Sequence, residues 1–313
     1  MTYKCTKCGK GKPIIELRYN RQTLCKSCFN ELFERRVRRT IRKGRLLEPT
    51  DKVAVGLSGG KDSTVTLHML KKLTSRMPKS SLAAIIVDEG IRGYRGAAIK
   101  AAKRVCEAED VGYHIFSVKD EYGLTMDQIA KKDRNVPACS YCGVIRRRIL
   151  NDKARALGCD RMATGHNLDD EIQTTLMNII RGDIRRIARM GSSVGVIKNN
   201  KFVQRIKPLR ETPEKESAVY ALVNGLGAEF SECPYSYDAF RKTVRDALNN
   251  IEEKHPGSKF QLLRTTDELI GLTRMQYDFK VGPGLCEKCG EPAAEKVCKT
   301  CQMVERIKTM SSS

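Results

Sequence analysis

Short apolar runs alternate with amphipathic stretches between residue 51 and about residue 210. Five runs have the length and composition of buried strands: KVAVGL (52–57), LAAIIVD (82–88), YHIFSV (113–118), CDRMATG (159–165) and KFVQRIKPL (201–209). Helical periodicity fills much of the intervening chain, over 61–75, 95–109, 141–157 and 168–181. Strand–helix alternation of this kind is typical of βαβ units. We therefore predict an α/β fold with a parallel five-stranded sheet and helices on both faces.

The chain outside this region has a different pattern. Residues 182–200 are basic and contain Gly and Ser, which predicts a mobile loop, whereas much of 211–280 has helical periodicity. The pattern predicts five segments: a cysteine module, a basic helix, the α/β domain, a helical extension and a second cysteine module, at 1–32, 33–50, 51–235, 236–282 and 283–313.

The charge indicates the class of partner. Lys and Arg number 58 against 37 Asp and Glu, a net charge of +21. A field of this sign favours polyanions, so we expect nucleic acid, although a merely solvated basic surface is the simpler alternative. No apolar stretch approaches the length of a membrane span, and MTYKCTKCGK lacks a signal-peptide core. We expect a cytoplasmic protein without a membrane partner.

The cysteines favour metal binding over disulfides, because the cytosol keeps thiols reduced. Ten of the 13 cysteines fall in CxxC pairs. Two pairs near each end of the chain supply four thiolates, enough for a closed tetrahedral zinc site. The two predicted structural Zn²⁺ sites consist of Cys5, Cys8, Cys25 and Cys28, and of Cys286, Cys289, Cys298 and Cys301. Zinc would hold a small fold together in either module, and flanking lysines make RNA contact an additional possibility.

A glycine-rich segment, SGGKDS, follows the first predicted strand and opens a helix. It fails the Walker A pattern because Asp62 follows Lys61 and Val55 stands where the first glycine belongs. Backbone N–H groups at a helix start can still hold an anion. The segment resembles the PP-loop of ATP pyrophosphatases, which hold the β,γ-pyrophosphate and leave the α-phosphorus open to attack, and it implies a Rossmann-like PP-loop domain. The ATP-binding residues implied are Ser58, Gly59, Gly60, Lys61, Asp62, Ser63, Val87, Asp88, Gly165 and His166.

A third group of cysteines lies within the α/β region. Cys139 and Cys142 form a CxxC pair at a helix start, and Cys233, in the turn-rich SECPY, is the best further ligand. Three cysteines suit a [4Fe–4S] cluster with one iron free of protein ligands. A persulfide-bearing or redox-active dithiol is the main alternative, and a third zinc is a weaker one.

Together these segments resemble the PP-loop tRNA 2-thiouridine synthetases of the TtuA and cytosolic wobble-thiolation type. The resemblance rests on the CxxC pairs near both ends of the chain and on the segments SGGKDS, VDEGIRGYR, CSYCGVIRRRIL, TGHNLDDEIQT and ECPY. It covers nearly the whole chain. It implies a [4Fe–4S] cluster on Cys139, Cys142 and Cys233 whose free iron can hold a sulfide. It also implies ATP and Mg²⁺ as cofactors, tRNA as substrate, and a homodimer.

The resemblance leads to a two-step hypothesis. ATP activates C2 of a tRNA uridine as an adenylate, and sulfur then displaces AMP. Asp169 or Asp170 would hold Mg²⁺ or act on the uridine N3 proton, although acids in a helix's first turn are also ordinary dipole partners. Arg146, one turn after Cys142, would stabilise charge, whereas Arg147 and Arg148 would contact tRNA or solvent.

RNA contacts are expected from residues 35–45 and 184–189 and from the zinc modules. The wobble uridine is the expected target, with the T-loop uridine as the alternative, and the sulfur donor is sulfide or a ubiquitin-like thiocarboxylate carrier. Other hypotheses are a cluster-free persulfide mechanism, a PP-loop enzyme acting on a small molecule, and a non-catalytic RNA-binding zinc protein.

Overall fold

A central sheet organises the chain in the computed structural model, which describes residues 4–194, 201–236, 240–276 and 284–310. The strand order is β5-β4-β3-β6-β8-β7. The first five strands are parallel, which confirms the prediction, and β7 joins the edge antiparallel to β8. The strands are β3 (Lys52–Gly56), β4 (Ser81–Asp88), β5 (Gly112–Ser117), β6 (Arg161–Ala163), β7 (Ser193–Val194) and β8 (Gln204–Ile206).

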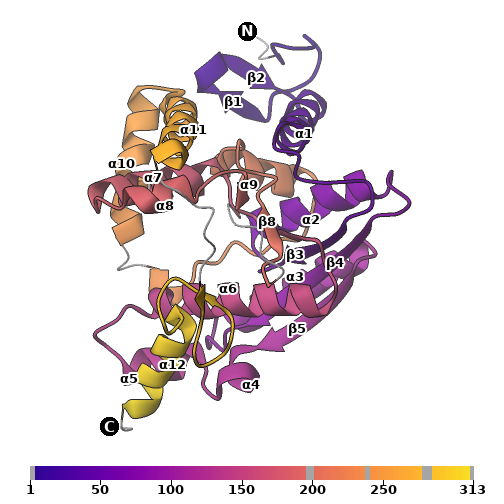
Figure 1. The fold of residues 1–313 in the computed structure, drawn as a ribbon. Coiled ribbons are helices and arrows are strands. Elements are labelled where there is room, and N and C mark those ends of the chain that lie inside the picture. The colour runs from indigo at the N-terminus through magenta and orange to yellow at the C-terminus, as the bar shows by residue number, and fades with distance from the viewer. Residues whose placement is uncertain (1–3, 195–200, 237–239, 277–283, 311–313) are drawn as a thin grey trace.

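The two faces of the sheet bury different helices because successive side chains of a strand point to opposite faces. Val53 and Val55 pack in one core with residues of α2 (Lys61–Thr74) and α3 (Arg95–Ala108). Ala54, between these valines, packs in another core with residues of α6 (Ala138–Ala156). The expected layer of helices on each face is therefore present, as Figure 1 shows.

The prediction that residues 182–200 form a loop was wrong for the described part of this segment, which contains a helix and a strand. After α7 (Leu168–Ile180), the chain forms α8 (Ile184–Ala188) and then β7. The Asp183 side chain accepts a hydrogen bond from the Arg186 N–H and starts α8, and Ile187 packs against Ile270 of α11 (Ser258–Gln276). Ile187 is buried, so this basic stretch packs against the rest of the chain instead of lying free as a loop. Residues 195–200 lie outside the described part of the chain.

The N-terminal module leads directly into a long helix. Strands β1 (Ile15–Leu17) and β2 (Gln22–Leu24) pair. Helix α1 (Lys26–Lys43) starts within the second CxxC pair, earlier than the predicted start at residue 33. Its apolar side chains recur at helical spacing and pack against Tyr220 of α9 (Glu214–Val223) and residues of α2. The stripe consists of Phe29, Phe33, Val37 and Ile41.

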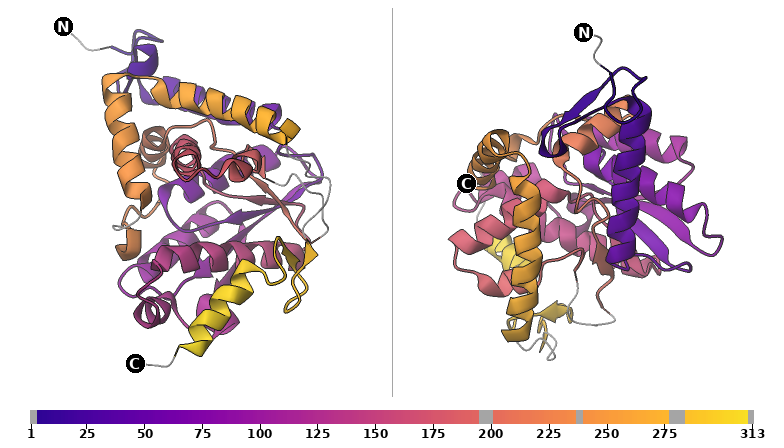
Figure 2. Two further views of the ribbon diagram at one scale, coloured as in Figure 1. Left: turned by 60° about the vertical axis from the view of Figure 1, so that its left-hand side comes forward. Right: turned by 90° about the horizontal axis from the view of Figure 1, so that it is seen from above.

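The remaining helices surround the sheet. α10 (Phe240–Lys254) and α11 (Ser258–Gln276) pack on α7, and α11 also contacts α8 (Figure 2). Two short helices, α4 (Val118–Tyr122) and α5 (Met126–Lys132), follow β5. The C-terminal module has β9 (Gly284–Leu285), β10 (Pro292–Ala293) and α12 (Lys299–Thr309), and α12 packs on α6. Among the described helices, none is both long and apolar enough to cross a membrane.

Candidate active site

The glycine-rich loop lies at the carboxyl end of β3 and leads into α2. Gly59 has a φ of 88°, and a Cβ there would lie 2.0 Å from the Ala98 carbonyl oxygen, so no side chain fits. The Ser58 and Ser63 hydroxyl oxygens are 3.0 Å apart, and the Ser63 hydroxyl donates to the Gly60 carbonyl at 2.9 Å. The loop is therefore held in shape by the chain itself. Its backbone N–H groups, at the start of α2, provide the anion site that the sequence predicts.

Charged side chains surround this helix start. Lys61 Nζ lies 2.7 Å from Glu214 Oε1 and 3.1 Å from Asp62 Oδ2. Burial raises the pKa of Asp62, even though Lys61 lowers it. Asp62 Oδ1 is buried and accepts no hydrogen bond from the described residues. A buried carboxylate oxygen without a donor suits a hard cation, so these residues fit Mg²⁺ beside a bound polyphosphate.

The other predicted nucleotide segments meet this loop. A Cβ on Gly165 would lie 2.7 Å from the Ser63 nitrogen, so the segment after β6 packs directly on the loop. His166, in the same segment, places Nδ1 2.8 Å from Thr164 Oγ1. Desolvation and nearby cations, chiefly Lys207, lower the pKa of His166 to about 3, so its ring is neutral.

The end of β4 is fixed by backbone contacts. The Val87 carbonyl accepts hydrogen bonds from Arg95, and Asp88 Oδ1 accepts one from the Gly90 N–H at 2.9 Å. Like the segments after β3 and β6, this one follows the carboxyl end of a parallel strand, where open α/β sheets bind ligands.

Two neighbouring acids of α7 have different surroundings. Asp169 is buried, and its oxygens contact the Glu214 N–H at 2.7 Å and the Lys259 ammonium group. Asp170 accepts from the Asn167 N–H at 3.2 Å in a capping box. Burial, with repulsion from Asp62 and Glu214, raises the pKa of Asp170 to about 6, although Arg241 opposes the shift. Asp170 therefore lies within the electrostatic reach of Asp62 in the loop and Glu214 of α9, whereas both oxygens of Asp169 already have partners in the chain.

The structure brings the three central cysteines into one neighbourhood. Cys139 and Cys142 lie in the first turns of α6, and the 3₁₀ turn η2 (Pro234–Ser236), which directly follows Cys233, contacts this helix. The Cys139 thiol donates to the Tyr235 carbonyl at 3.0 Å, and Cys142 and Cys233 adjoin the same apolar cluster. Two thiols at the edge of an apolar cluster and a third bonded to the turn after Cys233 form a donor set whose chemistry fits an iron–sulfur cluster.

A chain of ionic contacts, buried at Arg95 and Glu89 and exposed at Arg146, runs from the glycine-rich loop toward these cysteines. Arg95 is 3% exposed, donates to the Ser58 carbonyl at 2.5 Å, and pairs with Glu89 at 2.5 Å. Arg146, near Cys142, lies 3.8 Å from Glu89. Glu89 and Arg95 were not among the residues predicted from the sequence. Their only signal is an arginine six residues after an acid, and nothing local shows that both are buried.

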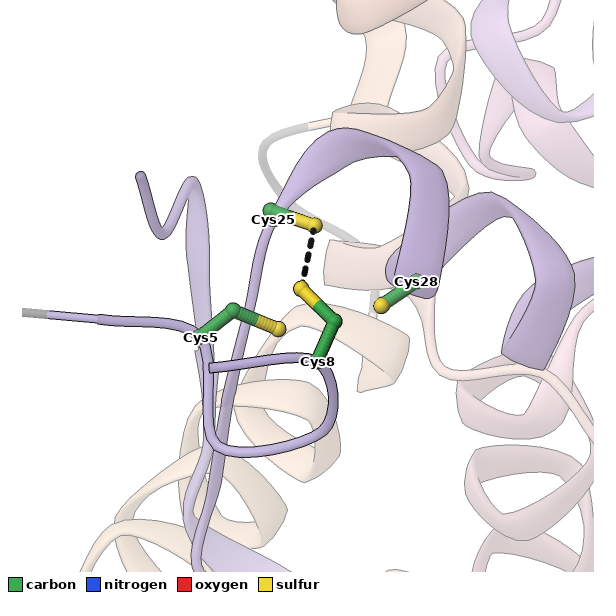
Figure 3. A group of neighbouring side chains, drawn as sticks. All are labelled: Cys5, Cys8, Cys25 and Cys28. Carbon is green, nitrogen blue, oxygen red and sulfur yellow. Dashed lines mark hydrogen bonds between the residues drawn. The ribbon is translucent and has the colours of Figure 1, made fainter. Parts of the chain in front are cut away.

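The terminal cysteines converge as predicted. In each module the four sulfurs lie within 4.8 Å of one another. Figure 3 shows the N-terminal four, where Cys8 and Cys25 sulfurs are 3.8 Å apart; Cys289 and Cys298 are 3.7 Å apart in the other module. A tetrahedral ion with Zn–S bonds of about 2.3 Å has sulfurs about 3.8 Å apart. Both groups therefore fit zinc.

The C-terminal module is attached to α6, the helix that carries Cys139 and Cys142. Arg155 contacts both carboxylate oxygens of Glu291, at 2.8 and 3.0 Å. Arg148, expected to face tRNA or solvent, instead pairs with Asp152 and donates to the Cys289 sulfur at 3.6 Å. Helix periodicity does not predict this contact, because Cys289 is 141 residues away in the chain.

This chain is similar to proteins of a known family. Residues 29–252 match the PP-loop domain model, and residues 4–30 match the N-terminal LIM domain model of the 2-thiouridine synthetase TtuA. The chain is 38% identical to the tRNA 2-thiolation protein NcsA of Haloferax volcanii over 98% of this chain and all of the relative. The chain belongs to the family of PP-loop tRNA 2-thiolation proteins.

Other relatives agree. Cytoplasmic tRNA 2-thiolation protein 1 of Aspergillus niger is 36% identical, with 97% of this chain and 88% of the relative covered. Among solved structures, the U34-tRNA thiolase NcsA of Methanococcus maripaludis, with its [4Fe–4S] cluster, matches with a TM-score of 0.85 and 40% identity. That match covers 100% of this chain and 99% of the other. The predicted family membership is thus confirmed.

Proposed function

We propose that this protein is an ATP-dependent tRNA uridine 2-sulfurtransferase that acts on the wobble uridine. The observation that carries the proposal is the chain of contacts from Ser58 through the buried Arg95 and Glu89 to the exposed Arg146, because it joins an ATP loop to a three-cysteine site. The name of the M. maripaludis thiolase specifies U34 and supports the wobble position over the T-loop. The names of the eukaryotic relatives support a cytoplasmic location.

In the first step the uridine C2 oxygen attacks the α-phosphorus of ATP, and pyrophosphate leaves. The loop N–H groups and Lys61 would hold the departing pyrophosphate, with Mg²⁺ on Asp62. Asp170, whose pKa is raised to about 6, would be ionised at neutral pH and would accept the uridine N3 proton or bind the metal. Asp169 is not part of this proposal, because both of its oxygens are occupied.

In the second step sulfur adds at C2 and AMP leaves with the original oxygen, so no electrons are transferred. A [4Fe–4S] cluster held by Cys139, Cys142 and Cys233 would supply the sulfur as a nucleophile from its free iron. Arg146, beside Cys142, would offset the negative charge that develops between phosphate and sulfur. A sulfide or thiocarboxylate donor and a homodimer remain part of the proposal.

Replacing Cys139 tests the cluster. We expect Cys139→Ala to abolish thiolation of unmodified tRNA, assayed anaerobically with ATP, Mg²⁺ and sulfide by mass spectrometry of the nucleosides. ATP binding should persist, because Cys139 lies on α6, whereas the loop lies between β3 and α2. Cys159→Ala is the matched control, since Cys159 lies outside all three cysteine groups. Thiolation by the Cys139 variant would contradict the cluster mechanism.

Mapping the product separates the remaining hypotheses. Ribonuclease digestion before mass spectrometry would place 2-thiouridine at the wobble position, whereas a T-loop product would refute that part. Release of pyrophosphate should depend on tRNA. Release of pyrophosphate without tRNA would favour a small-molecule substrate. If no pyrophosphate were released under any condition, the result would favour a non-catalytic RNA-binding protein.

A further inference from the structure

A basic groove runs between α1 and α11, the two long helices that lie side by side in Figure 2. Its volume is about 1380 Å³, and no residue of the glycine-rich loop or of the central cysteine site lines it. One acidic residue, Glu48, lines it together with seven arginines. These are Arg35, Arg36, Arg38, Arg39, Arg42, Arg45 and Arg264.

Five of the arginines lie on α1, Arg45 follows the end of α1, and Arg264 lies on the facing helix. Arg35, Arg39 and Arg42 are spaced four and three residues apart, which places them on one helix face at successive turns. Arg264 of α11 follows Phe260, another lining residue, by four residues. Turns of a helix rise by about 5.4 Å, so α1 presents a row of guanidinium groups along the groove.

Several of these cations are uncompensated. Arg38 pairs with Glu34 at 3.3 Å, and Arg39 pairs with Glu211 at 2.9 Å. In the described parts of the chain, by contrast, the exposed guanidinium groups of Arg42, Arg45 and Arg264 have neither an ion pair nor a hydrogen bond. The dipole of α1 accounts for a cation at Arg42, in its last turn, but not for one on α11. Positive charge gathered in a concave surface focuses the field on an incoming anion.

The floor of the groove is rigid. Arg36 is largely buried, donates to Glu216 at 2.6 Å and to the Tyr19 hydroxyl at 2.5 Å, and lies over the ring of Phe260. The Tyr19 and Phe260 ring centroids are 4.8 Å apart. These contacts hold the N-terminal module, α9 and α11 together, so the groove has its shape before any ligand binds.

We propose that this groove docks the phosphate backbone of the tRNA substrate at nucleotides outside the active site. The proposal rests on the proposed function for the identity of the RNA. Arginine binds phosphate oxygens with two parallel hydrogen bonds, and backbone contacts of this kind position an RNA without reading its sequence. A second copy of the chain is a poor occupant, because a two-fold contact through this groove would oppose arginines to arginines.

Charge reversal on both walls tests the proposal. We expect R42E/R264E to weaken tRNA binding about 10-fold or more at 0.15 M salt, measured by filter binding without ATP or sulfide. The slope of log Kd against log salt should fall by about 2, one for each lost phosphate contact. The neutral R42Q/R264Q should show a smaller loss in the same direction. Both positions are exposed, so ATP binding without RNA should be unchanged, and the unfolding temperature should fall only slightly, because Arg42 loses its favourable contact with the α1 dipole.

The matched control reverses two exposed lysines outside the groove. K100E/K119E makes the same change in net charge on α3 and α4. An equal loss in this control would show that net charge alone drives binding and would overturn the proposal. Unchanged tRNA binding by R42E/R264E and R42Q/R264Q would also overturn the proposal. A change in the oligomeric state of these variants without a change in tRNA binding would overturn it as well.

The readouts separate this proposal from the proposed function. Wild-type protein that binds tRNA through the groove but never thiolates it would refute the function and leave the groove intact. Thiolation with groove-independent binding would refute the groove alone.

Discussion

Asp169 and Asp170 show how neighbouring residues of one type acquire different chemistry. Asp169 is buried with a backbone N–H and Lys259 as partners, so it is already neutralised. Asp170 has Asp62 and Glu214 nearby, and burial raises its pKa to about 6. An acid that titrates near neutral pH beside a nucleotide loop is suited to proton transfer, whereas a fully paired acid stabilises the fold.

The Asp170 carboxyl predicts a pH profile. Below pH 6 the group is protonated and cannot accept a proton, so kcat/KM should rise about tenfold per pH unit up to about pH 6 and then level. We expect Asp170→Asn to lower kcat/KM about 100-fold or more and to remove this rise. Because the raised pKa means that folding disfavours the ionised form, the variant should be at least as stable at neutral pH. A steady-state pH series, with thermal unfolding as control, checks both, and an unchanged profile would contradict the assignment.

At the scale of elements, Arg95 connects β3, β4 and α3 at the nucleotide edge. Its guanidinium group donates to carbonyls that end β3 and β4, those of Ser58 and Val87, and pairs with Glu89. One buried side chain therefore links the loop to the residues that lead toward the cysteines. Lysine has a single charged nitrogen and cannot replace this planar set of donors.

Arg95→Lys should weaken ATP binding about 10-fold, because buried carbonyls left without donors cost about 1–3 kcal/mol each. Calorimetric titration with ATP measures this effect, and iron content should stay at the wild-type level because the cysteines are untouched. Arg92→Lys, an exposed neighbour outside the buried network, is the control. Equal ATP affinity of the wild type and the Arg95 variant would contradict the role of Arg95 in positioning the loop.

The C-terminal module forms a second connection between elements, through Arg148 and Arg155 of α6. We expect Cys298→Ser to reduce bound zinc from two ions to about one per chain, because each module has one four-cysteine group. Limited proteolysis should then cut first within residues 284–310. Metal analysis of the variant beside Cys159→Ser checks this, and two retained zinc ions would refute the closed site.

At the scale of the whole molecule, a net charge of +21 predicts how tRNA binds. The chain has no Trp and few aromatic residues, so phosphate contacts rather than base stacking should dominate. We expect tRNA affinity to fall at least about 100-fold between 50 and 200 mM salt, while ATP affinity changes far less. Binding titrations over this range measure both, and salt-independent tRNA binding would refute a phosphate-dominated interface.

Several features could be predicted from sequence because their signals are local. The strand–helix alternation gave the five parallel strands, SGGKDS gave the loop that opens α2, and paired CxxC spacings gave both four-cysteine groups. In each case the residues that identify the feature are near one another in the chain, or their chemistry allows few partners.

Only the tertiary structure decided which distant groups meet. Asp169 pairs with Lys259, Arg148 reaches Cys289, and Ile187 orders the expected loop by packing on Ile270. The sequence by itself determined the fold class and the reactive residue types, because backbone periodicity and ligand chemistry are local properties. The roles of Asp170, Arg95 and the arginine groove depend on burial and on unpaired charge, which exist only once the chain is folded.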